Sequence, residues 1–343
     1  MTHRVSPEST PSTSDSPFPE VAEPVLRRVQ STIISWFESA ARDLPWRHPE
    51  TSAWAVLVSE IMSQQTPVSR VEPRWREWMS AWPTPADLAA APTAEVLQRW
   101  DRLGYPRRAL RLQEAARVIA EEKGNTVPDT AEELEGLPGI GSYTAAAVAS
   151  FAHGRKTTVL DTNVRRVLIR LFAGRERPAT SPSRKETVWA SGFVPEHDHV
   201  QWNAGVMEFG ALVCTARKPD CAACPLQDLC TWYQLGRPAS ATKPKTQKWA
   251  GTDRQLRGAI MDVLKTGHAA GAEQPGIDID LFTTSVTALD PDLFDALNEP
   301  TAAALARVRE LSTDAERISR LIGDLVTDGL AQRNGHGLRL PSR

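Results

Sequence analysis

Four cysteines are the residues of this 343-residue chain whose spacing points most clearly to chemistry. They are Cys214, Cys221, Cys224 and Cys230, which lie within 17 residues and are the only cysteines present. Thiolates this close together bind zinc or an iron–sulfur cluster. Zinc sites usually pair two C-x2-4-C knuckles, but the C-x6-C-x2-C-x5-C spacing has one, and a single loop can wrap a [4Fe-4S] cluster. The cysteines alone leave a cluster, zinc and unliganded thiols open.

Two carboxylates stand next to apolar sequence and could act as an acid and an anion. Glu60 lies in a predicted helix, 53–65, beside the arc formed by Trp54, Leu57, Val58, Ile61 and Met62. Gln64 lies one turn after Glu60, and Gln65 falls inside the apolar arc unless the helix ends there, as Pro67 suggests. Asp161 precedes a predicted helix, 162–173, and is an N-cap candidate. A lone carboxylate is more often a solvated charge or a cap, so these residue types alone assign no catalyst.

The segment Leu137-Pro-Gly-Ile-Gly141 lies between helical patterns at 129–135 and 143–152. Gly139 and Gly141 permit a tight turn, and the amides at the start of the second helix would form an anion site. Such a helix-hairpin-helix binds a DNA phosphate without reading base sequence. An ordinary tight turn between two helices is the alternative interpretation.

Helical periodicity positions these residues, and no strand alternation is found before residue 250. We expect an all-α body in which helices at 25–41, 71–81, 93–100, 107–122, 184–192 and 199–212 join those already named. Residues 1–24 begin with a stretch rich in Ser, Thr and Pro and are predicted to be a disordered leader. Residues 237–252 have no periodicity and are predicted to be a linker.

The overall charge is nearly balanced, with 40 Lys and Arg against 42 Asp and Glu. Residues 25–250 carry an excess of five basic residues, which permits a polyanionic partner without requiring one. The composition excludes collagenous, membrane-spanning and wholly disordered proteins, because hydrophobic residues make up 41% and no apolar run approaches the roughly 20 residues of a membrane span. The N-terminus lacks the apolar stretch of a signal peptide, so we expect a cytoplasmic protein whose cysteines do not form disulfides.

Taken together, these motifs resemble the adenine DNA glycosylases of the MutY type, within the endonuclease III helix-hairpin-helix superfamily. The resemblance covers about residues 25–236. It rests on the four-cysteine loop and on VSEIMSQQTPVSRV (58–71), LGYPRRA (103–109), LPGIGSYTAAAVASF (137–151) and VLDTNVRRVL (159–168). It implies a base-excision-repair hydrolase, a [4Fe-4S] cluster as cofactor, and a monomer that binds double-stranded DNA containing adenine opposite 8-oxoguanine or guanine. It also implies two lobes, a cluster lobe (25–48 and 156–236) and a helical barrel lobe (49–155).

The resemblance also assigns roles to the candidate residues. Glu60 would protonate the departing adenine, and its position beside apolar surface suits the raised pKa that such an acid requires. Asp161 would stay ionised and stabilise the cationic sugar. Tyr143 and Asn163 would support this site. Gln64, Gln65 and Tyr105 would wedge into the space that the flipped adenine leaves, while Leu137, Gly139 and Gly141 would contact DNA in the hairpin, and the four cysteines would hold the cluster.

Tyr143 separates this interpretation from its nearest relatives. Endonuclease III-like enzymes that also cut the strand carry a Lys just after the hairpin, and a phenol cannot form their Schiff base. We therefore expect no efficient lyase activity. Two alternatives stay open, an oxidised-pyrimidine glycosylase/lyase and a redox-sensing iron–sulfur DNA-binding regulator. Pro106, where many relatives have a second Tyr, puts stacking at that position in doubt.

The tail at 253–343 lacks the strand pattern and the Phe-Ser-His motif of the Nudix-like domain that usually recognises 8-oxoguanine in this family. How the opposite base is recognised is thus left open. Helical patterns at 253–265 and 314–328 and a hairpin at Asn334-Gly335 predict a winged-helix-like module. Its net charge of −4 favours packing against the body, with weak DNA contact if any.

Overall fold

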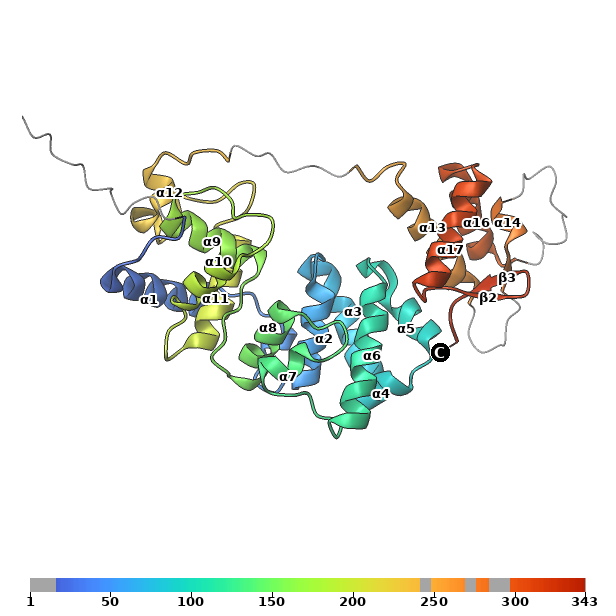
Figure 1. Cartoon of the computed structure of the whole chain (residues 1–343), viewed down its shortest axis with the longest axis horizontal. Coiled ribbons are helices and arrows are strands. Elements are labelled where there is room, and N and C mark those ends of the chain that lie inside the picture. Colours follow the sequence, from blue (N-terminus) through green and yellow to red (C-terminus); the bar gives the residue numbers. More distant parts are fainter. Residues whose placement is uncertain (1–16, 241–247, 269–275, 284–296, 343) are drawn as a thin grey trace, which may run out of the picture. The chain divides into compact units, whose positions relative to one another are not determined.

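A computed structural model of the protein describes residues 17–240, 248–268, 276–283 and 297–342 (Figure 1). The chain forms two compact units. Unit 1 is drawn from residues 1–47, 129–131 and 142–243, and unit 2 from residues 48–128, 132–141 and 244–343. Helices dominate both units and the described strands are confined to the tail, which confirms the predicted fold class. Within the described ranges, no helix is both long and apolar enough to span a membrane.

Unit 1 is built around the packing of α1, α9 and α11. Its elements are α1 (Glu23–Ala40), η1 (Pro45–Arg47), α8 (Ser142–His153), α9 (Thr162–Ala173), α10 (Arg184–Ser191), α11 (His199–Leu212), η3 (Gln227–Leu229) and α12 (Thr231–Gln234). The core is made of aliphatic and aromatic residues from these helices, including Ile33, Val167, Trp202 and Phe209, together with Phe193 from the segment after α10. The helix ends agree with the sequence pattern to within about two residues, because apolar spacing and caps coincide there.

Helix α9 is buried from Val164 to Phe172, and three of those buried residues are arginines. Arg165 donates to both carboxylate oxygens of Glu186, at 2.7 and 2.8 Å, while Arg166 and Arg170 donate to backbone carbonyls of the cysteine loop. Each buried charge is therefore hydrogen-bonded, as burial of a cation requires.

The ordered N-terminal segment begins before the predicted boundary at residue 25. Helix α1 starts at Glu23, and the rings of Phe18 and Trp189 lie 5.3 Å apart between centroids. The Trp189 indole N–H also donates to the Pro19 carbonyl, at 2.8 Å. The prediction of a disordered leader is wrong for residues 17–24, because Phe18 supplies an apolar anchor; residues 1–16 lie outside the described part of the chain.

The first part of unit 2 packs around α2, whose residues 54–62 are all buried. Its helices are α2 (Ala53–Ser63), α3 (Val68–Ala81), α4 (Pro85–Ala90), α5 (Thr93–Trp100), η2 (Asp101–Leu103), α6 (Arg107–Glu122) and α7 (Ala131–Glu135). The rings of Trp78 pack edge-on against those of Trp82 and Trp100. Helix α2 ends at Ser63 and Gln65 has a φ of 56°, so the helix stops before Gln65 as Pro67 predicted.

The tail belongs to unit 2 and combines helices with a small sheet. It contains α13 (Asp253–Gly267), β1 (Ile277–Asp278), α14 (Asp280–Thr283), α16 (Glu299–Leu311), α17 (Ala315–Thr327), β2 (Gln332–Asn334) and β3 (Gly337–Arg339). The strand order is β1-β3-β2, all antiparallel, and Gly335 and His336 form the turn that joins β2 to β3. The predicted hairpin is present, but its turn lies one residue after the predicted Asn334-Gly335, because Asn334 pairs with Gly337 at the end of β2. Strand β1 was not predicted, because two residues carry no alternation. Part of the predicted linker, 241–247, lies outside the described residues.

The tail packs on α5 and the turn that follows it. Gln98 donates to the carbonyls of Lys265 and His268, at 3.1 and 2.6 Å, and the Lys265 ammonium donates to the Asp101 carbonyl at 2.8 Å. Arg107 at the start of α6 pairs with Asp328, 3.2 Å away. The expected packing of the tail against the body is therefore present, although the predicted domain boundaries stay predictions.

Candidate functional site

Asp161 is the N-cap of α9 in unit 1, as its sequence position suggested. Its Oδ1 accepts from the Val164 amide at 2.6 Å and its Oδ2 accepts from the Asn163 side chain at 2.8 Å. Burial raises the pKa of Asp161, and these donors together with Arg166 oppose that rise without cancelling it. The site thus holds a carboxyl group whose charge depends on its donors.

Asn163 connects Asp161 to the cysteine loop. The Asn163 Oδ1 accepts from Arg166 at 2.7 Å, and Arg166 also donates to the carbonyls of Gly210 and Cys214, at 2.6 and 2.8 Å. A Cβ built on Gly210 would lie 2.7 Å from the Asn163 Cβ, so a glycine is needed where α11 meets α9. Asn163 therefore donates directly to the Asp161 carboxyl group, and its supporting role in the reaction stays a prediction.

Tyr143 lies in the first turn of α8, also in unit 1, and is half-buried. Its hydroxyl donates to the Met207 sulfur at 3.7 Å, which ties it to α11. A phenol rather than an amine therefore occupies this position, fixed by neighbouring structure.

Glu60 lies in unit 2, in the second half of α2, and is only 7% exposed. The sequence placed it beyond the edge of the apolar arc, yet the whole helix segment around it is buried. Gln64 is the C-cap of this helix, and Gln65 is exposed in a left-handed conformation. Glu60 thus lies inside α2, and the two glutamines directly follow its C-terminal end, with Gln65 exposed.

Arg108 is a site residue that sequence reasoning did not identify. Its guanidinium donates to the Ile61, Met62 and Gln64 carbonyls at 2.6 to 3.2 Å, and to those of Leu103 and Gly104 at 3.0 and 2.9 Å. Burial lowers the pKa of Arg108 to about 10, so it stays charged at neutral pH. One cation therefore holds the end of α2 and the loop before Tyr105 together.

Tyr105 stands on that loop with a φ of 48° and is 41% exposed. A left-handed conformation is costly for a residue with a Cβ, and the hydrogen bonds from Arg108 to the preceding carbonyls hold the loop. The structure thus brings Gln64, Gln65 and Tyr105, predicted as wedge residues, to two loops joined by Arg108. The apolar face of α6 gave a signal for Arg108, which lies one turn before buried Leu112.

The predicted hairpin has a tight turn at residues 137–140. The Leu137 amide donates to the Leu134 carbonyl and the Ile140 amide to the Leu137 carbonyl, each at 3.1 Å. Gly139 has a φ of 74°, and a Cβ there would lie 2.6 Å from the Arg111 Cβ, so only glycine fits. Leu137 is buried and anchors the turn, whereas Gly141 is exposed with open space beside it.

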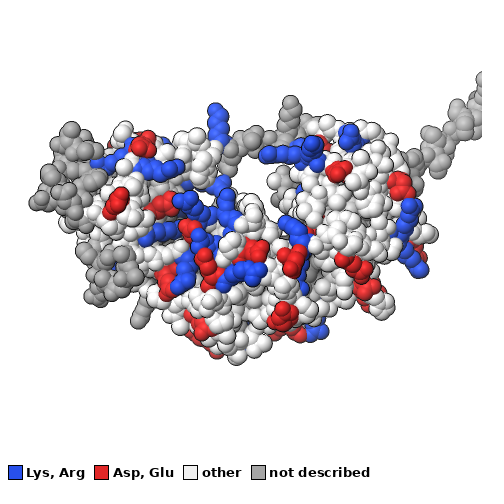
Figure 2. Space-filling view, turned by 180° about the vertical axis from the view of Figure 1, so that it is seen from behind, with Lys and Arg blue, Asp and Glu red and all other residues white. Residues whose placement is uncertain are grey.

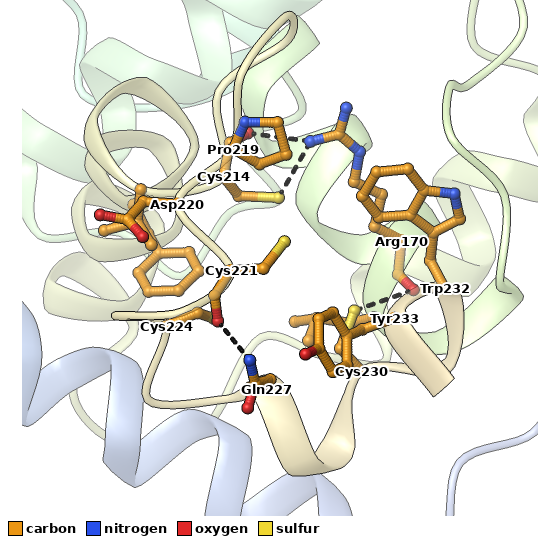
Figure 3. Close-up of a pocket in the computed structure, with 13 residues that line it drawn as sticks. Arg170, Cys214, Pro219, Asp220, Cys221, Cys224, Gln227, Cys230, Trp232 and Tyr233 are labelled. Atoms are coloured by element: carbon orange, nitrogen blue, oxygen red, sulfur yellow. Dashed lines mark hydrogen bonds between the residues drawn. The ribbon is translucent and has the colours of Figure 1, made fainter. Parts of the chain in front are cut away.

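The four cysteines line one pocket in unit 1, together with Arg170 and Trp232 (Figure 3). None of the four forms a disulfide. Arg170 donates to the Cys214 sulfur at 3.3 Å, its guanidinium carbon lies 4.5 Å from the Trp232 ring centroid, and Gln227 donates to the Cys221 carbonyl at 2.7 Å. The loop is thus braced from α9 and from within.

The donor set fits an iron–sulfur cluster. Burial raises the pKa of Cys224 to about 11 and also raises that of Cys230, so an adjacent cation is needed to hold thiolates there. The four thiols line one pocket and supply the one thiolate per iron that a [4Fe-4S] cluster takes.

On the face drawn in Figure 2, Lys and Arg side chains are interspersed with Asp and Glu side chains. This face therefore offers local basic contacts rather than a uniformly basic surface.

Comparisons with known proteins agree with the motifs and the geometry. The adenine DNA glycosylase of Mycolicibacterium smegmatis is 47% identical over 272 residues, which cover 79% of this chain and 92% of that protein. The corresponding protein of Mycobacterium tuberculosis is 46% identical over 255 residues, 74% of this chain and 83% of that protein. The chain belongs to the adenine DNA glycosylase family. Its relatives are hydrolases acting on N-glycosyl bonds, so this member is assigned to the same enzyme class.

Two family models and the solved structures add detail to this membership. Residues 58–191 match the HhH-GPD superfamily base excision DNA repair protein, and residues 214–230 match the iron–sulfur binding domain of endonuclease III, which contains all four cysteines. The cluster prediction is therefore confirmed. A thermostable thymine-DNA glycosylase has a TM-score of 0.57 and 29% identity, covering 62% of this chain and 98% of that one. An endonuclease III trapped on DNA has a TM-score of 0.56 at 24% identity and shows the shared fold.

Proposed function

We propose that this family member removes adenine mispaired with 8-oxoguanine or guanine from duplex DNA by hydrolysis. The observation that carries the proposal is the pair of buried carboxyl groups, one in each unit, within a chain of this family. Glu60 lies on α2, and Asp161 caps α9 with Asn163 beside it. These are the two groups that N-glycosyl hydrolysis requires.

In the proposed reaction, Glu60 gives its proton to the purine ring as the bond between adenine and the sugar breaks. Asp161 as a carboxylate stabilises the positive charge that develops on the sugar. A water then adds to the sugar and loses its proton to the Glu60 carboxylate, which restores the acid. Asn163 keeps the acceptor oxygen of Asp161 in place and favours its ionised form. The iron–sulfur cluster takes no part in these steps; when bound by the four cysteines, it fixes the loop that follows α11.

We further propose that the enzyme is monofunctional. Strand cleavage by an imine route needs a primary amine at the position of Tyr143, and the phenol there is directed to Met207. The wedge residues Gln64, Gln65 and Tyr105 would fill the stack when adenine leaves it, and the hairpin with Gly139 and Gly141 would contact a phosphate. A monomer is sufficient for this mechanism.

The test is a single-turnover assay on a 30-base-pair duplex with adenine opposite 8-oxoguanine, compared with adenine opposite guanine and adenine opposite thymine. We expect strand breaks in the first two duplexes after alkali treatment and few without it. Binding without any alkali-sensitive site would favour a DNA-binding regulator. Breaks without alkali, or breaks only at oxidised pyrimidines, would favour a glycosylase/lyase of the endonuclease III type.

A further inference from the structure

Arg254, in the first turn of α13, lies against two exposed aromatic rings. Its guanidinium carbon is 4.4 Å from the Tyr105 ring centroid and 5.2 Å from the Trp249 ring centroid. Both distances are within the range of cation–π contacts. Tyr105 is 41% exposed and Trp249 is 55% exposed, so these rings share an accessible surface with the arginine. The tail thus reaches the predicted wedge residue directly.

The charge of Arg254 is not neutralised by a carboxylate in the described part of the chain, unlike that of its neighbours. The adjacent acid, Asp253, pairs with Arg317 and Arg320 at 2.8 and 2.7 Å. Arg257, one turn further along α13, pairs with Asp328 at 2.6 Å. The tail carries a net charge of −4, but Asp253 and Asp328 are already paired with other arginines, and Arg254 keeps its positive charge at the start of α13.

A guanidinium that lies against aromatic rings keeps its N–H edges free. Those edges match the paired oxygens of a phosphate, and aromatic rings beside them are typical of surfaces that bind nucleic acid. Helix α13 is also fixed to the body, because Gln98 and Asp101 hold its C-terminal end through Lys265 and His268. Arg254 is therefore presented from a packed helix rather than from a free chain.

We propose that Arg254, supported by Tyr105 and Trp249, binds a backbone phosphate of the DNA duplex next to the base step that Tyr105 enters. This inference deepens the proposed function and depends on the wedge position of Tyr105. It revises the expectation that the tail contacts DNA weakly if at all. The tail then helps to hold DNA beside Tyr105, a function that its negative net charge did not indicate.

The test measures DNA affinity of the full-length, cluster-containing protein by fluorescence anisotropy as KCl is varied. The probe is a duplex with a tetrahydrofuran abasic analogue opposite 8-oxoguanine, and a second duplex has guanine instead. One phosphate contact contributes about 0.9 to the slope of log Kd against log salt, which corresponds to about an eight-fold change between 1 M and 0.1 M salt. We expect Arg254→Ala to lower the slope by about this amount and to weaken binding about eight-fold at 0.1 M KCl, equally on both duplexes.

Arg333→Ala is the matched control, because it removes the same charge from an exposed arginine on β2. We expect it to change Kd less than two-fold, and Arg254→Lys to keep the salt slope because it keeps the charge. Equal effects of the two alanine variants would overturn the proposal, as would a larger effect of Arg333→Ala, which would assign binding to the β2–β3 hairpin. If Arg254→Ala lost several-fold more affinity for one duplex than for the other, Arg254 would contact a base edge and not a phosphate. Failure of adenine release with normal probe binding would refute the proposed function alone.

Discussion

Glu208 on α11 offers a quantitative test of how the unit that carries Asp161 is held together. Its side chain is 1% exposed, and its carboxylate accepts from Arg42 at 2.6 and 2.7 Å and from Arg47 at 2.9 Å. Burial alone would raise the pKa of Glu208, but these arginines lower it to about 2, from an ordinary value of 4.5. The pair joins α11 to the segment that follows α1.

The size of this effect follows from linkage. A carboxyl group with a lowered folded-state pKa adds stability that is fully present above pH 4.5 and is lost as pH falls through about 2. The difference of about 2.5 pKa units corresponds to about 3 kcal/mol at neutral pH. Glu208→Gln keeps two polar atoms in place but removes the charge, so we expect a loss of about 1 to 3 kcal/mol in the free energy of unfolding.

The assay is urea unfolding at pH 7 of the cluster-containing protein, followed by far-ultraviolet circular dichroism and by cluster absorbance. The control is Glu23→Gln, which removes an exposed carboxylate that pairs with Arg27 in the same unit. Surface pairs contribute little, so this variant should unfold at nearly the wild-type urea concentration. Equal urea midpoints for the two variants would refute the prediction that the buried ion pairs of Glu208 stabilise the protein more than an exposed pair does.

Three further predictions address the site. Arg108→Ala leaves buried carbonyls unpaired at two loops, so we expect DNA affinity and the rate of adenine release to fall at least ten-fold. Arg107→Ala, one residue earlier, is the control and should change either quantity less than three-fold. Similar losses in the two variants would contradict the central role of Arg108. Asn163→Ala removes a hydrogen-bond donor that favours ionised Asp161, so the pKa of Asp161 should rise further. Because Asp161 must be ionised for excision, the acid side of the pH profile of the single-turnover rate should move to higher pH. An unchanged profile would show that Asn163 does not act on the reaction through Asp161. Gly139→Ala should weaken DNA binding more than Gly141→Ala, since a Cβ at 139 would collide with Arg111 and require a strained φ, and the reverse order would show that internal packing does not set the hairpin.

The sequence was informative wherever the signal was local. Periodicity and caps placed α9 with Asp161 at its start, and Pro67 indicated the end of α2 before Gln65. The Asn-Gly pair likewise predicted the hairpin of β2 and β3, with its turn one residue too early. Each of these features depends on residues within a few positions of one another, which is why pattern alone was sufficient.

Contacts between distant residues could not be predicted in this way. Arg107 and Arg108 are indistinguishable as neighbours in LGYPRRA, yet one pairs with Asp328 on the tail and the other holds carbonyls more than 40 residues away. The contact between Arg254 and Tyr105 depends on how the tail packs, and net charge concealed it. The order of residues 17–22 depends on Trp189, far along the chain. Such contacts depend on tertiary packing, which cannot be read from composition or local sequence pattern.

The proposed function depends on Glu60 as the acid that protonates the departing adenine. The most direct measurement is the single-turnover rate of Glu60→Gln on the duplex with adenine opposite 8-oxoguanine, alongside its affinity for that duplex and its cluster absorbance. We predict a rate at least a thousand-fold below wild type with affinity within about three-fold and the cluster intact, because glutamine keeps the shape of the side chain but has no proton to give. A near-normal rate from the folded, cluster-containing variant would contradict the account.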